Sequence, residues 1–161
     1  MCGRYALSRT ELLEEYFEFS FSGRQIIPRF NVAPTTQIPV IRLRQDGRSE
    51  LIEMRWGLVP LWSRPEDKLL LMINARAETV SSTPAFREAF KRRRCIVPAS
   101  GYYEWQKLPG GAKQPFYITR RDRQPIGFAG LWENAKEVHG TTAIVTTAAS
   151  EETREIHDRM S

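Results

Sequence analysis

Cysteine and histidine are both scarce in this chain of 161 residues, which contains two of each. The cysteines, Cys2 and Cys95, are too few for the disulfide framework that small secreted domains use to support a small core. They also show no Cys/His spacing typical of a zinc site. We therefore expect a protein of a reducing, cytoplasmic compartment that uses no metal and no cofactor.

Long apolar runs are missing as well. No stretch approaches the ~20 residues that a membrane-spanning helix needs, and the first residues lack the basic and apolar regions of a signal peptide. We expect no membrane partner. Hydrophobic residues make up 41% of the sequence and charged residues 27%, which is ordinary for a globular protein. The length suits one domain with a sizeable core, expected over residues 1–161.

Basic residues outnumber acidic ones, with 24 Lys and Arg against 19 Asp and Glu and a net charge of +5. Arginine dominates the basic stretches KRRR at 91–94 and TRRDR at 119–123. Its guanidinium group binds phosphate in a bidentate manner, which lysine cannot do. This distribution is compatible with a polyanionic partner and equally with solvated basic surfaces, so charge alone does not identify the partner.

Most of the chain has the pattern of β-strands. Alternating apolar residues on both sides of the turn signal Gln45-Asp46-Gly47 predict a hairpin from strands at 38–43 and 51–59. Further strands are expected at 95–105, 115–120, 125–132 and 141–149. The predicted fold class is α+β, with mainly antiparallel strands curled into a barrel-like core and helices at its periphery.

Helices are expected in three places. A capping box formed by Ser8 and Glu11 precedes a helical apolar spacing over 9–18. Thr83, followed by a proline, is expected to begin a helix that ends in the KRRR run, which would be an exposed helix end. Ser150 is expected to begin the last helix. The stretch 28–36, with two prolines and no periodicity, is predicted to be a loop.

Four residues far apart in the sequence are candidates for chemistry. Removal of Met1 would place an amine and a thiol on adjacent carbons of Cys2, although a chance cysteine or a small packed side chain explains its position too. Glu104 interrupts the aromatic run GYYEW, where a carboxylate is costly unless it is paired, functional or turned outward. Asn74 also fits a strand-end amide, and His157 a surface or cap residue. The residue pattern does not show that the four converge.

The motifs MCGRY, NVAPT, RWGLVPLW, INARAET, RRCIVPASGYYEW, AGLW and IHDRM occur in this order between residues 2 and 160. Together they resemble the SOS response-associated peptidase (SRAP) family, whose eukaryotic relatives are abasic-site sensors. The resemblance implies an autopeptidase that crosslinks, in a lyase-type reaction, to abasic sites in single-stranded DNA through Cys2. The implied companions in the active site are Asn74, Glu104 and His157. The implied DNA-groove residues are Arg4, Asn31 and Arg76.

The implied chemistry gives Cys2 a purpose. An open abasic sugar carries an aldehyde, with which a neutral α-amine (pKa about 7.7–8.0) forms a Schiff base that the adjacent thiol closes to a thiazolidine. Met1 must leave first, and a chain that retains it is not expected to crosslink. Glu104 is expected to protonate the sugar ring oxygen, His157 to transfer a proton at the imine, and Asn74 to orient the reacting groups. When bound to DNA the protein is expected at the nucleoid.

Three expectations concern other parts of the chain. Trp62, in a proline-bounded loop, is a candidate to stack on a base beside the lesion, and a core tryptophan is equally open. Cys95 is expected to be a buried strand residue without chemistry. Members of the family continue beyond HDRM, so we expect this chain to lack the family's C-terminal segment.

Two other classes of function stay open at this point. One is a cysteine or N-terminal-nucleophile peptidase that acts on other substrates. The other is a non-catalytic nucleic-acid-binding domain in which Cys2 is incidental. Replacing Cys2 by alanine separates them, because only a crosslinking protein loses covalent capture while its non-covalent DNA binding persists.

Overall fold

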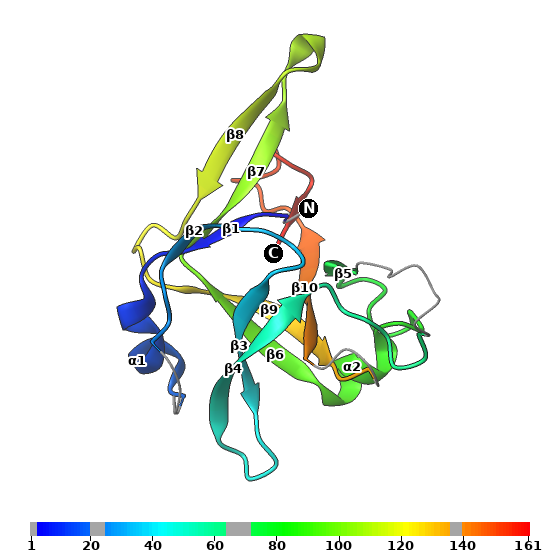
Figure 1. The fold of residues 1–161 in the computed structure, drawn as a ribbon. Helices are drawn as coiled ribbons and strands as arrows, with labels where there is room; N and C mark the ends of the chain where they lie inside the picture. The colour runs from blue at the N-terminus through cyan, green and yellow to red at the C-terminus, as the bar shows by residue number, and fades with distance from the viewer. Residues whose placement is uncertain (1–2, 20–24, 64–71, 136–139) are drawn as a thin grey trace.

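The computed structural model describes residues 3–19, 25–63, 72–135 and 140–161 (Figure 1). A four-stranded sheet has the order β2-β1-β7-β8, and a seven-stranded sheet has the order β11-β10-β4-β3-β6-β9 with β5 also paired to β10. Because β10 pairs with β9 as well, the larger sheet closes on itself as a barrel. None of the helices in the described ranges is long and apolar enough to cross a lipid bilayer.

The elements have the following bounds. The smaller sheet contains β1 (Tyr5–Leu7), β2 (Arg29–Val32), β7 (Gly101–Lys107) and β8 (Lys113–Ile118). The larger sheet contains β3 (Gln37–Leu43), β4 (Ser49–Trp56), β5 (Asn74–Arg76), β6 (Arg94–Ala99), β9 (Ile126–Glu133), β10 (Thr141–Ala148) and β11 (Arg159–Met160). The helical elements are η1 (Thr10–Leu12), α1 (Leu13–Phe17), α2 (Arg87–Arg92) and η2 (Pro109–Gly111). The α+β class with a barrel-like core and peripheral helices is confirmed.

An aromatic cluster joins the two sheets. Tyr5 of β1 is fully buried, with its ring 5.5 Å from that of Trp56 and 6.0 Å from that of Phe128 between centroids. Tyr102 of β7 lies 5.8 Å from Phe128 in an edge-to-face arrangement. The indole N–H of Trp56, which could not be left unpaired in a core, donates to the carbonyl oxygen of Ile73 at 2.9 Å. The smaller sheet is therefore packed against the barrel through β1 and β7.

The strand predictions hold in part. The hairpin predicted at 38–59 is confirmed as β3 and β4, whose register runs from Gln37 opposite Arg55 to Leu43 opposite Ser49. The loop predicted at 28–36 is wrong, because Arg29–Val32 form β2 against β1. A single strand at 95–105 is also wrong: the chain divides at Ser100 into β6 and β7, which belong to different sheets.

The helix predictions fail where tertiary partners replace local ones. Ser8 is not an N-cap, because Arg9 occupies that position before η1 and no side chain caps the helix. The backbone N–H groups of Ser8 and Arg9 donate to the Ser100 hydroxyl at 2.9 and 3.1 Å. The helix at 9–18 is shortened to η1 and α1. The hydroxyl of Thr83 donates back to the Thr79 carbonyl at 2.8 Å, and α2 begins only at Arg87. The last segment forms turns and then β11, which pairs with β10, so the helix expected from Ser150 is absent from the described chain.

The KRRR run is an exposed helix end only in its first half. Lys91 and Arg92 occupy the exposed last turn of α2. Arg93 turns inward instead, where its guanidinium contacts the Glu133 carboxylate at 2.6 and 2.9 Å. Glu133 is 3% exposed. A carboxylate buried to this extent depends on its cation, so Arg93 holds α2 against β9.

Replacing Glu133 by alanine is expected to lower the free energy of unfolding by about 3 kcal/mol, because it leaves the half-buried Arg93 charge without its partner. Urea denaturation measures the change. The matched control is Glu88→Ala, which removes an exposed partner of Lys91 on the same helix and should cost less than about 1 kcal/mol. Equal losses for the two variants would contradict a structural role of the Arg93–Glu133 pair.

Candidate functional site

An open cavity of about 500 Å³ lies on the outer face of the smaller sheet. Among the residues that the structure describes, Arg4, Asn31, Tyr103 and Trp105 line it. The Arg4 guanidinium donates to the Asn31 side-chain oxygen at 3.0 Å, and the Tyr103 hydroxyl donates to the Phe30 carbonyl at 2.9 Å. The cavity thus combines a cation, an amide and two aromatic rings, which is the composition of a site for a phosphate and a base.

Glu104 belongs to β7, the strand that carries Tyr103 and Trp105, but its side chain lies on the opposite face of that strand. Side chains alternate along a strand, so Glu104 shares its face with the core residue Tyr102 and with Gln106. It is 3% exposed, which excludes the outward-facing alternative. The Gln106 side-chain amide donates to the carbonyl of Glu155 at 2.8 Å. The Glu104 face of β7 therefore meets the C-terminal segment 150–158, which contains His157.

His157 has two partners at the same ring nitrogen. Its Nδ1 accepts a hydrogen bond from the backbone N–H of Arg159 at 3.0 Å, and it lies 2.9 Å from the Asp158 carboxylate. These two contacts fix the orientation of the imidazole ring within the C-terminal segment.

Arg159 clamps the C-terminal segment to the barrel. It forms a bidentate pair with Glu78 at 2.8 and 3.0 Å and donates to the Thr146 carbonyl at 2.6 Å. The guanidinium of Arg159 also lowers the pKa of Glu78 from its ordinary value of 4.5. Glu78 follows β5 closely in the chain, so the clamp connects the His157 segment to the strand that begins at Asn74.

Strand β10 brings these parts to one end of the barrel. Half-buried Asn74 lies opposite Ile144 of β10, and exposed Arg76 lies opposite Thr146. The next positions of β10 pair with β11, directly after the His157 turn. Figure 1 shows the start of β1 and the C-terminal end of the chain at this end of the barrel, near β7 and the end of β10. The parts of the chain that carry Asn74, Glu104 and His157 thus lie around one end.

Cys2 lies outside the described residues. The described chain begins at Gly3, and its first strand runs along β7: Tyr5 is opposite Tyr102, and the Tyr103 N–H donates to the Arg4 carbonyl at 2.9 Å. The described start of the chain is therefore adjacent to the residues that flank Glu104.

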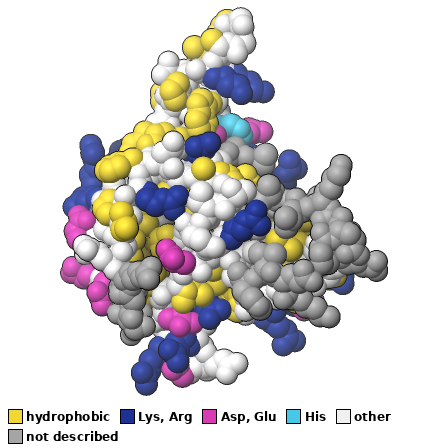
Figure 2. All heavy atoms as spheres, viewed as in Figure 1, with side chains coloured by type: hydrophobic (Ala, Val, Ile, Leu, Met, Phe, Trp, Pro, Cys, Tyr) yellow, Lys and Arg dark blue, Asp and Glu magenta, His cyan; other side chains and the backbone are white. Residues whose placement is uncertain are grey.

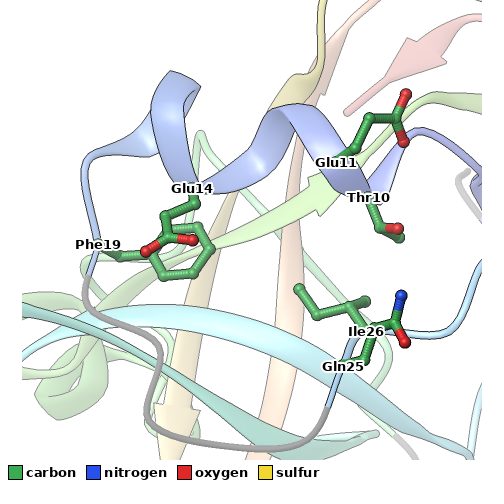
Figure 3. Close-up of a pocket in the computed structure, with 6 residues that line it drawn as sticks. All are labelled: Thr10, Glu11, Glu14, Phe19, Gln25 and Ile26. Carbon is green, nitrogen blue, oxygen red and sulfur yellow. The ribbon is translucent and has the colours of Figure 1, made fainter.

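Two other cavities lack this composition. The cavity beside α1 is about 210 Å³ and is lined by Thr10, Glu11, Glu14, Phe19, Gln25 and Ile26 (Figure 3). Its two carboxylates disfavour a polyanion. A larger cavity of about 620 Å³ between β1–β2 and β3–β4 is lined mainly by apolar side chains and contains none of the candidate site residues.

Comparison with known proteins identifies the relationship. The sequence profile of the family described as "SOS response associated peptidase (SRAP)" matches residues 1–161. The chain belongs to the SRAP family. Similar members include the abasic site processing protein YoaM of Bacillus subtilis, 38% identical over 99% of this chain and 73% of its own length. Another is YedK of Escherichia coli, also 38% identical over 99% of this chain and 73% of its own length.

A more distant relative and two solved structures are also similar to this chain. The abasic site processing protein HMCES of Gallus gallus is 33% identical over 83% of this chain and 49% of its own length. The crystal structure of a protein from Bacteroides thetaiotaomicron superimposes with a TM-score of 0.85 at 28% identity, covering 99% of this chain and 75% of that one. A Bordetella bronchiseptica protein gives a TM-score of 0.80 at 29% identity, covering 99% and 82%.

Within this SRAP-family chain, the two remaining candidates, Trp62 and Cys95, differ in exposure. Trp62 follows β4 with 58% of its surface exposed, so the core alternative is wrong and stacking on a base stays a prediction. Cys95 is confirmed as a buried strand residue: burial raises the pKa of its thiol to about 12, which makes it a poor nucleophile at neutral pH. Sequence reasoning missed Tyr103 and Trp105, although their alternation around Glu104 was a usable signal for an exposed aromatic face.

Replacing Glu78 by glutamine is expected to loosen the C-terminal segment, because Arg159 loses its charged partner. In the unchanged protein the same loosening is expected on acidification. The pKa of Glu78 is lowered in the folded state, so the pair contributes fully above pH 4.5 and is lost as the pH falls through the lowered value. Hydrogen exchange of the peptide 149–161 measures both effects. Unchanged protection in Glu78→Gln at neutral pH would contradict the clamp, and Glu88→Gln is the control.

Proposed function

We propose that this protein captures abasic sites in single-stranded DNA by forming a thiazolidine between Cys2 and the opened sugar after removal of Met1. One observation carries the proposal: the buried carboxylate of Glu104 lies on the strand that runs beside the described start of the chain, on the face that meets the His157 segment. The relatives named abasic site processing proteins support the choice of substrate.

The strand flanking the abasic site would be held by the opposite face of β7, while the abasic sugar itself would reach the Glu104 face near the described start of the chain. Arg4 supplies a cation, Asn31 fixes the guanidinium in place, and Tyr103 and Trp105 offer ring faces to bases in the same cavity. Exposed Arg76 supplies a further cation on β5, at the barrel end where the candidates gather. Figure 2 shows cationic side chains scattered over the face of the molecule that it draws. Single-stranded DNA suits such a surface because its bases are available for stacking.

The covalent reaction would proceed in four steps: removal of Met1, opening of the sugar, formation of a Schiff base and closure of the thiazolidine ring. Hydrolysis of the Met1–Cys2 bond consumes one water and frees the α-amine. The Glu104 carboxyl gives a proton to the sugar ring oxygen, the C1′–O4′ bond breaks, and the C1′ hydroxyl returns a proton to Glu104, which leaves the abasic sugar as its open aldehyde. The amine adds to the aldehyde carbon and water leaves, which forms the Schiff base. The Cys2 thiolate then adds to the imine carbon, the nitrogen takes up a proton, and the thiazolidine ring is complete.

His157 and Asn74 would manage protons and orientation in these steps. The two contacts at Nδ1 of His157 orient its imidazole ring, which would give a proton to the departing water and later receive one. Asn74, held in register at the start of β5, can donate and accept hydrogen bonds and would orient the amine or the open sugar.

Cys2→Ala is expected to abolish the covalent product with a single-stranded oligonucleotide that carries one abasic site, while non-covalent binding persists. A denaturing gel and an intact-mass spectrum measure this, and the spectrum also reports whether Met1 has been removed. The matched control is Cys95→Ala, which removes the buried thiol and should crosslink like the unchanged protein. A covalent product in Cys2→Ala, or its absence in unchanged protein that lacks Met1, would overturn the proposal.

Glu104→Gln is expected to slow crosslinking by about 100-fold or more, because the amide cannot give a proton to the sugar oxygen. Its affinity for undamaged single-stranded DNA should stay within about twofold, since Glu104 faces away from the binding cavity. Single-turnover crosslinking rates and fluorescence anisotropy measure the two quantities. Glu155→Gln, an exposed change in the neighbouring segment, is the control, and equal rates for both variants would refute the role of Glu104.

A further inference from the structure

The β7–β8 hairpin projects beyond the body of the protein (Figure 1). Its register pairs Tyr103 with Tyr117, Trp105 with Pro115 and Lys107 with Lys113. Residues directly opposite each other point to the same side of a sheet, and side chains alternate along each strand. One side of the hairpin therefore presents Tyr103, Trp105, Lys107, Lys113, Pro115 and Tyr117, which we call the hairpin outer face.

The two tyrosines of this face are held in place by their contacts. The rings of Tyr103 and Tyr117 lie 4.9 Å apart between centroids with an angle of 35° between their planes. The end of the Tyr117 ring lies against Gly101, where an added Cβ would come within 2.6 Å of its Cζ. Tyr103 is anchored through its hydroxyl to Phe30. Trp105 and Tyr117 nevertheless remain 37% and 46% exposed, so they form a preformed apolar platform open to solvent.

The two lysines of this face repel each other in the folded protein. Lys107 and Lys113 lie directly opposite each other, and like charges in that position destabilise a strand pair. Both residues are exposed. A polyanion bound along the hairpin would remove this repulsion by placing phosphates beside both ammonium groups.

We propose that the hairpin outer face binds single-stranded nucleic acid and extends the binding cavity from Arg4 and Asn31 towards the hairpin tip. Continuity supports this occupant, because Tyr103 and Trp105 belong to both the cavity and the face. Bases stack on the aromatic rings and phosphates lie against the lysines. The inference rests on the proposed function for its ligand, single-stranded DNA. The hairpin outer face itself recognises neither a base sequence nor the abasic site.

The first test measures binding of undamaged single-stranded DNA of about 15 nucleotides by fluorescence anisotropy over a range of salt concentrations. Tyr117→Ala is expected to weaken binding by about 5- to 10-fold through the loss of one stacked base. The double variant Lys107→Gln/Lys113→Gln is expected to weaken it similarly and to reduce the slope of log K against log salt by about 1.4, the value for two lost phosphate contacts.

Two controls match these variants. Phe116→Ala removes an aromatic ring of similar exposure from the opposite side of β8. Arg44→Gln/Arg48→Gln removes two positive charges from the β3–β4 hairpin, at the other end of the molecule (Figure 1). Both controls are expected to bind within about twofold of the unchanged protein. Thermal melting verifies that all four variants are folded.

The outcomes separate this inference from the proposed function. Affinity of both outer-face variants equal to that of the unchanged protein would overturn the inference, as would an equal loss in Phe116→Ala. If the outer-face variants lost binding to anionic lipid vesicles but kept their affinity for DNA, the hairpin outer face would be a membrane-binding surface, and the inference would be overturned. A crosslinking test with an abasic oligonucleotide of about 5 nucleotides, too short for the hairpin, reports on the proposed function alone. Outer-face variants should crosslink it at the unchanged rate.

Discussion

Strand β10 is the element on which the arrangement of this protein depends. It pairs with β9 and β4 along its first half, which closes the barrel, and with β5 and β11 along its second half. The parallel pairing with β5 places Asn74 and Arg76 at one end of the barrel, and the pairing with β11 brings the end of the chain to the same place. Three buried threonines satisfy the polar requirements of this strand, since Thr141, Thr142 and Thr146 are all fully buried and hydrogen-bonded.

A second constraint is the alternation of side chains along β7. One strand supplies the buried carboxylate of Glu104 on one side and the rings of Tyr103 and Trp105 on the other. Because the strand is paired on both edges, by β1 and β8, its residues cannot exchange sides. This separation means that a change on the binding side need not disturb the buried side.

The C-terminal segment is joined to the rest by the short pairing of β11 with β10 and by a few polar side-chain contacts, rather than by a core. Gln106 contacts the Glu155 carbonyl, Arg121 pairs with Glu152, and Arg159 binds Glu78 and Thr146. Polar contacts at a surface contribute little each and depend on pH and salt. The segment that carries His157 is therefore the part of the described site whose attachment is most sensitive to solution conditions, whereas Glu104 and Asn74 are fixed by strand pairing.

Sequence alone determined the features that depend on local pattern and on covalent identity. Alternation of apolar residues around a Gln-Asp-Gly turn was enough for the β3–β4 hairpin, and the ordered motifs were enough for the SRAP family. Tertiary structure decided the rest. The capping box of Ser8 and Glu11 did not form, and the Ser8 backbone N–H, which Glu11 would accept in such a box, donates to the Ser100 hydroxyl instead. Arg29–Val32 became a strand because β1 lay beside it. The burial of Glu104 depends on which side of β7 faces the barrel, and neighbours distant in sequence set that side. Local propensity is a weak term, and it yields wherever a distant hydrogen-bond partner or a buried surface contributes more.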